Sequence, residues 1–205
     1  MKWVCSPIGY FPVYQYSRPV QSSSCVSTAK VAFWNRHRLL WEQHVSWTRM
    51  AIISLVFNLP DIEFVLTRLL RNATDMGELL RPYYGDAVAD EYSRLVKEHL
   101  TTAAELVKAV LAGNTEQAMK LEKDWYRNAD DLAVFLNKIS PYINLEGIRK
   151  MFYDHLTLTK MEVICMIDRN FELDIEVFDQ IELEALAMAD MISEGIFKMF
   201  PSVFT

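Results

Sequence analysis

The segments Val96–Val107 (VKEHLTTAAELV) and Phe152–Val163 (FYDHLTLTKMEV) decide the fold, because one pattern of residue types occurs in both. Each places an acid directly before a histidine and spaces its apolar residues three or four apart, as on the buried face of a helix. Further on, Leu121–Leu132 (LEKDWYRNADDL) and Ile181–Ile192 (IELEALAMADMI) share Glu, Ala and Asp at matching positions. We therefore predict a helical hairpin that occurs twice, over residues 86–139 and 144–200.

A related pattern lies upstream, where Glu42 and His44 stand in the segment LWEQHV. It belongs to a predicted first helix that begins near Ser27 or Thr28 and ends near Asn58, before Pro60. One or two short helices are expected over residues 61–84, and longer ones at about 86–112, 115–139, 144–168 and 173–200. The predicted fold class is all-α: an up-and-down bundle of the ferritin-like or four-helix type, made of a duplicated hairpin and one extra long N-terminal helix.

The chain has 205 residues, half of which are apolar, and its composition limits the classes of function that are possible. Residues 1–28 form a tail rich in Pro, Tyr and Ser, and residues 29–205 are expected to be one bundle domain. A formal net charge of −6, with acids spread along the chain, argues against nucleic acid as a partner. No apolar run is long enough to span a membrane, and no signal peptide is recognised, so a cytoplasmic or spore-associated protein is expected. The tail is a candidate contact for a protein partner, and a homo-oligomer stays open.

The histidines are the candidate functional residues. Short turns make neighbouring helices antiparallel, so the helices that carry His44, His99 and His155 run in one direction and place the imidazoles at one height. Asp130 and Asp190 are expected to reach the same level from the partner helices, and Glu162 and Glu182 to form a layer one to two turns away. His37, flanked by Arg36 and Arg38, is expected on a solvated helix face.

A buried imidazole or carboxylate without a partner costs several kcal/mol, so these groups should meet one another or a shared cation. The predicted metal ligands are His44, His99, His155, Asp130, Asp190, Glu162 and Glu182, and the candidate ions are Fe, Zn and Mn, with no nucleotide. The Glu-x-x-His pairs of di-iron carboxylate proteins do not occur in the sequence. If the protein is an enzyme, oxidation-reduction or metal-assisted hydrolysis would fit, with Glu162 or Glu182 as proton acceptor.

A resemblance supports the metal hypothesis. At LWEQHVSWTRMAIISLVFNLP, WYRNADDLAVFL, MFYDHLTLTKMEV and ALAMADMISEGI, the chain resembles a family of small uncharacterised helical proteins of spore-forming Firmicutes, over about residues 36–201. Members are often labelled acetylglutamate kinase. That label is not adopted, because an amino-acid kinase requires alternating strands and helices with glycine-rich phosphate loops. The repeated acid–histidine helix is also distantly similar to the duplicated helical bundles of Bacillus metalloproteins.

The alternative is a non-enzymatic structural or interaction protein of the spore or cell envelope. In that reading the buried polar layer only fixes the register of the helices, and the tail makes the contacts. Metal content separates the two hypotheses.

Overall fold

The computed structural model describes residues 26–205, and the predictions for residues 1–25 of the tail lie outside the described residues. Six α-helices follow one another: α1 (Thr28–Val56), α2 (Ile62–Tyr84), α3 (Asp86–Leu111), α4 (Thr115–Ile139), α5 (Leu145–Ile167) and α6 (Phe171–Met199). The all-α bundle is confirmed. Residues 62–84, expected as one or two short helices, form one helix of 23 residues, because Pro82 falls in its last turn, where it interrupts little.

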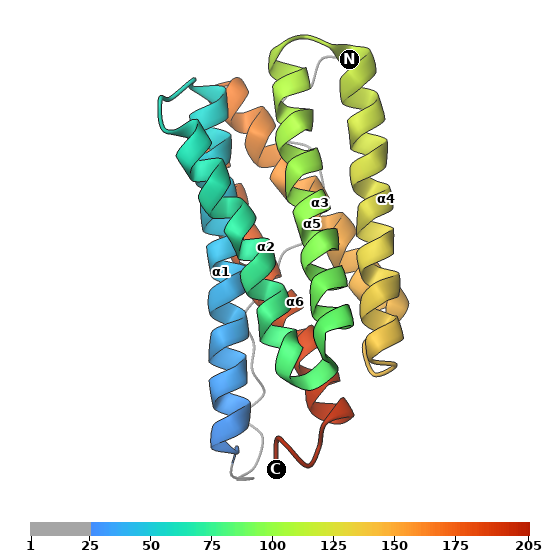
Figure 1. Ribbon diagram of the computed structural model, residues 1–205. Coiled ribbons are helices and arrows are strands. Elements are labelled where there is room, and N and C mark those ends of the chain that lie inside the picture. Colours follow the sequence, from blue (N-terminus) through green and yellow to red (C-terminus); the bar gives the residue numbers. More distant parts are fainter. Residues whose placement is uncertain (1–25) are drawn as a thin grey trace.

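The helices form a closed ring. Each packs against the next along the chain, and α6 closes the ring on α1. Figure 1 shows the up-and-down course, with α5 and α6 behind the other four helices. The two ends of the described chain meet beside this closure, where Ser27 Oγ donates a hydrogen bond of 2.8 Å to the carbonyl of Phe204. Among residues 26–205, no helix is long and apolar enough to cross a lipid bilayer.

The ring consists of three hairpins, α1–α2, α3–α4 and α5–α6, whose turns share one geometry. Asn58, Gly113 and Arg169 each have a positive φ, of 50°, 70° and 57°. The amide that follows each of them donates to the carbonyl five residues back, at 2.8–2.9 Å. This left-handed residue with its backward hydrogen bond is the Schellman ending of a helix. Helices α1, α3 and α5 therefore end in the same way, although five residues connect α1 to α2 and three connect the helices of each of the other two hairpins.

Candidate metal centre

Three imidazoles meet in the middle of the bundle. His44 in α1, His99 in α3 and His155 in α5 are each no more than 4% exposed. Each stands 12 residues before the last residue of its helix (56 − 44, 111 − 99 and 167 − 155), which places them at one height. The ring centroids lie 5.7, 6.1 and 6.3 Å apart, so the triangle is nearly equilateral. One ligand atom from each lies within 4.8 Å of the others. The predicted shared interior of the three histidines is confirmed.

Each imidazole is held by the second helix of its own hairpin. His44 Nδ1 lies 3.2 Å from Asn72 Oδ1 in α2, and His99 Nδ1 lies 3.0 Å from Asn128 Oδ1 in α4. In the third hairpin, His155 Nδ1 lies 3.0 Å from Oε2 of Glu184 in α6. The outward-facing nitrogen of every ring is therefore occupied, which leaves Nε2 for the interior.

The two asparagines also fix the tautomer. Asn72 Nδ2 donates to the carbonyl of Leu40 at 2.9 Å, and Asn128 Nδ2 donates to the carbonyl of Leu95 at 3.1 Å. A carbonyl can only accept, so the amide nitrogen must face it and the amide oxygen must face the imidazole. The proton of His44 and of His99 then lies on Nδ1, and Nε2 keeps its lone pair. This is the tautomer that binds a metal through Nε2.

Glu184 is the only acid among the three partners. Its Oε1 is buried without a hydrogen-bond partner, and burial, followed by the charge of Asp154, holds its pKa well above the usual range. Burial lowers the pKa of His155 to about 4. Both shifts favour the neutral forms, so without a cation the contact is a neutral hydrogen bond, although its geometry also satisfies an ion pair.

The other two histidines are neutral at pH 7 as well. Burial lowers the pKa of His44 to about 3, and the neighbouring His155 adds to the effect. The pKa of His99 is also held well below 6.5, first by burial and then by His155 and His44. A histidine binds a metal as the neutral imidazole and not as the imidazolium. At neutral pH these rings therefore need not lose a proton before an ion is bound.

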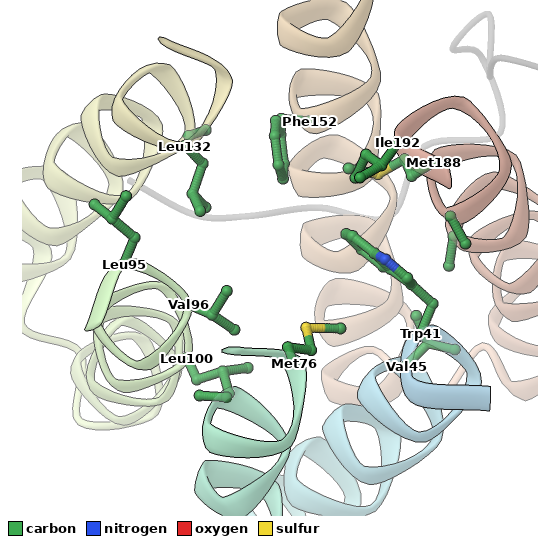
Figure 2. Packing of buried hydrophobic residues seen from close by; sticks show 14 of the residues in the cluster. Trp41, Val45, Met76, Leu95, Val96, Leu100, Leu132, Phe152, Met188 and Ile192 are labelled. Atoms are coloured by element: carbon green, nitrogen blue, oxygen red, sulfur yellow. The ribbon is translucent and has the colours of Figure 1, made fainter. Parts of the chain in front are cut away.

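An apolar layer covers one side of the triangle. Figure 2 shows Trp41, Val96 and Phe152 reaching one interior from α1, α3 and α5, and each stands three residues before a histidine of the cluster. A small cavity of about 10 Å³ lies between these residues and the imidazoles. That space is at the lower limit for one water molecule.

The donor set fits a transition-metal ion. For an equilateral triangle with sides of 4.8 Å, the upper limit here, each donor lies 4.8/√3, or about 2.8 Å, from the centre. Zinc–nitrogen bonds are about 2.0–2.1 Å long. For an ion in the plane of the three donors, each imidazole nitrogen would therefore have to move inward by at most about 0.8 Å. Neutral imidazoles suit Zn, Fe, Cu and Ni better than they suit Mg or Ca.

The four predicted carboxylate ligands lie outside this cluster, and the prediction is corrected for each. Asp130 accepts hydrogen bonds from Arg149 at 3.0 Å and from Tyr153 at 3.1 Å. Asp190 accepts a hydrogen bond from Trp34 and lies 3.4 Å from Arg38.

Glu162 is buried but accepts a hydrogen bond of 2.5 Å from Arg49, which also pairs with Asp174 at 2.7 Å. Glu182 is partly buried, and burial followed by the nearby Glu42 raises its pKa. The levels were wrong mainly in the third hairpin. The second helix of this hairpin was predicted to begin near residue 173, whereas α6 begins at Phe171, and Glu184 rather than Asp190 lies level with His155.

His37 does not lie on a solvated face, and that prediction is wrong. The side chain is 1% exposed. Its Nε2 accepts a hydrogen bond of 3.0 Å from Trp41 Nε1, and its Nδ1 lies 2.8 Å from Ser193 Oγ. The flanking arginines misled the interpretation, because residues directly before and after a buried helix position point to other faces. His37 is a core histidine with both nitrogens bonded.

Asn72 and Glu184 were missed as partners, although the sequence spacing contains them. From His44 to His99 is 55 residues and from His99 to His155 is 56, while Asn72, Asn128 and Glu184 follow one another at 56 and 56. An alanine follows each of the three, at 73, 129 and 185. A search for a period near 56 residues would have placed all six side chains.

A comparison of the chain with protein-family models, curated proteins and solved structures finds no match.

Proposed function

We propose that this protein binds one transition-metal ion at the centre of the bundle, with His44, His99 and His155 as ligands through Nε2. The observation that carries the proposal is the convergence of three neutral imidazoles whose Nδ1 atoms are all engaged by outer partners. Such partners orient ligating histidines and fix their tautomers in metal sites. A set of core histidines that only filled space would not need three converging Nε2 atoms.

Zinc is the first candidate among the ions considered, and iron(II) the second. Three nitrogen donors are the ligand set of one class of zinc site, in which the fourth position stays open. Manganese favours carboxylate and water ligands, and none of the four predicted carboxylates contacts the cluster. An ion bound in this way would supply Lewis acidity. Glu184 in its carboxylate form would offset part of the positive charge of the bound ion, because it contacts Nδ1 of the ligand His155.

An open fourth position distinguishes catalytic from structural zinc sites, so the proposal includes a reactive centre without naming the reaction. The proton acceptors expected for such a reaction, Glu162 and Glu182, do not contact the cluster. Glu162 is instead held by Arg49. The cavity beside the imidazoles is bounded by apolar side chains, which would keep bulk water from the centre.

The alternative role, a polar layer that sets helix register, is favoured by one specific contact. Asn72 and Asn128 each bridge to the carbonyl four residues before the histidine they hold. These bridges fix the height of each second helix against its first, with or without an ion. The two roles differ in what the protein contains, so an experiment on metal content separates them.

The test is elemental analysis of protein purified without a histidine tag, followed by titration of the metal-free protein with Zn(II) and Co(II). We expect one equivalent of metal and, for Co(II), the visible absorption of a low-coordinate site. His99→Ala should abolish stoichiometric binding. His37→Ala is the matched control, because it removes an equally buried histidine that lies outside the cluster. Absence of metal in the protein as purified, with no binding on titration, would leave the register-setting role.

We further propose that the chain arose from three copies of one hairpin rather than two. The repeated turns, the 55–56-residue spacing of the histidines and the 56-residue spacing of their partners support this proposal. Membership of the Firmicutes family named above, and its distant similarity to duplicated metal-binding bundles, also stay proposals.

A further inference from the structure

A second cavity lies on the other side of the histidine layer. It has a volume of about 40 Å³ and is lined by residues of α1 to α5. Thr48, Ala103 and Thr159 line it four residues after His44, His99 and His155, which is about 6 Å along the helices. Ile52, Val107 and Val163 line it one further turn away, eight residues after the same histidines. The cavity therefore occupies the level directly beyond the imidazoles.

Small side chains create this space. Ala51, Ala103 and Ala104 all line the cavity, at a level where larger residues would fill the interior. Lys160 is the only lining residue with a charged side chain, and its ammonium group is ion-paired with Glu122. The wall is thus mainly apolar. The cavity comes closest to the surface at Lys160, whose side chain is partly exposed.

The wall offers no free charge and few hydrogen-bonding groups to a bound molecule. The Thr48 hydroxyl already donates to the carbonyl of His44 at 2.7 Å. Among the lining residues, Trp125 Nε1 and Thr159 Oγ1 are buried without a hydrogen-bond partner, so a neutral guest could form hydrogen bonds with these two groups, and the rest of the wall is almost entirely apolar. A charged molecule would lose its hydration without compensation. A volume of about 40 Å³ is several times the roughly 10–15 Å³ that one water needs, which leaves room for about two to four non-hydrogen atoms.

We propose that this cavity binds a small, uncharged, apolar molecule of the size of dioxygen and holds it beside the metal centre. Trp125 links the two sites, since it lines the cavity and its ring lies 5.4 Å from that of His99. The assignment to the metal centre rests on the proposed function. Binding in the cavity does not, and it is tested separately on metal-free protein.

The test uses xenon as an apolar probe of similar size. Methyl-labelled, metal-free protein is placed under xenon pressure and followed by NMR. We expect shifts of the methyl groups of Ile52, Val107 and Val163 and of the indole N–H of Trp125, saturating with pressure. Ala103→Leu should remove these shifts by filling the space, and Ala87→Leu, the same change at an exposed position of α3, should leave them. Thr159→Leu is a second filling variant if Ala103→Leu does not fold.

A second measurement places the cavity relative to the ion. In protein loaded with Co(II), bound ¹²⁹Xe should show a paramagnetic shift that is absent from the Zn(II) form. Shifts that survive both filling variants, or that do not appear in the wild type, would overturn the cavity proposal. Binding of xenon without a paramagnetic shift, in protein shown by its absorption to hold Co(II), would overturn the assignment to the metal centre. Failure to bind any metal would overturn the proposed function alone.

Discussion

Glu184 takes, beside His155, the place that Asn128 takes beside His99. Each residue lies 29 positions after its histidine and contacts Nδ1 at 3.0 Å. Asn128 has a second contact, from its amide nitrogen to the carbonyl of Leu95, whereas the second oxygen of Glu184 has no partner. The third hairpin thus carries an acid where the other two carry an amide, so Glu184 is the one ionisable residue among the three outer partners.

Glu184→Gln should therefore stabilise the metal-free protein, by about 1–2 kcal/mol in the free energy of unfolding. By analogy with Asn128, which donates to the carbonyl of Leu95, we expect the new amide nitrogen to donate to the carbonyl of Met151, four residues before His155. The same change should weaken metal binding by about 10- to 100-fold, because the negative charge behind His155 is lost. Urea unfolding and metal titration measure the two effects. Glu194→Gln, at an exposed position of α6, should change neither, and a loss of stability in the Glu184→Gln variant would contradict the assigned geometry.

A chelator should lower the melting temperature of the metal-loaded protein, because the ion binds only the folded state. We expect His155→Ala to abolish this dependence on chelator and His37→Ala to preserve it, as measured by calorimetry with and without EDTA. If the histidines only fix register, His155→Ala would still cost about 1–3 kcal/mol through the unpaired Glu184. EDTA would then leave the wild-type melting curve unchanged, and the metal proposal would be withdrawn.

His37 should make the protein less stable in acid. Burial lowers its pKa from 6.5 to about 3, so the unfolded chain takes up the proton first. The free energy of unfolding that the neutral His37 contributes is therefore complete above about pH 6.5 and is lost as the pH falls toward 3. Relative to His37→Gln, which keeps a neutral side chain, the wild type should lose about 1.4 kcal/mol per pH unit between pH 6 and pH 4. Parallel stability curves for the two proteins over this range would show that His37 is already charged in the fold.

Arg49→Met should destabilise the protein by about 2–3 kcal/mol at pH 8, since it leaves Glu162 and Asp174 buried without their cation. Burial raises the pKa of Glu162 to about 7. At pH 5 that carboxyl is protonated, and the loss should be smaller. Chemical unfolding at both pH values measures the difference. Arg94→Met removes an arginine whose ion pairs are exposed and should change stability by less than about 0.5 kcal/mol. An equal loss at both pH values for Arg49→Met would contradict the protonation of Glu162.

The helices and the histidine layer could be predicted from the sequence because they depend on local signals. Ser27, Asn114 and Asn170 cap their helices as expected of such residues. Equal distances from the histidines to the helix ends then fixed their common height. The outer partners depend on the length of each turn, and an error of six residues in the third hairpin led to Asp190 being predicted in place of Glu184. Burial of His37 depended on which side of α1 faces α6, a long-range contact that its neighbours in sequence do not encode.

The closure of α6 on α1, with the hydrogen bond between Ser27 and Phe204, bears on how freely the chain can be rearranged. In a closed ring of similar hairpins, no hairpin has to come first. A circular permutant that joins the segments near Ser27 and Phe204 by a short linker and begins at α3 would keep every contact of the histidine layer. The histidine layer then does not depend on which hairpin comes first in the sequence. It depends only on the order of the three hairpins around the ring.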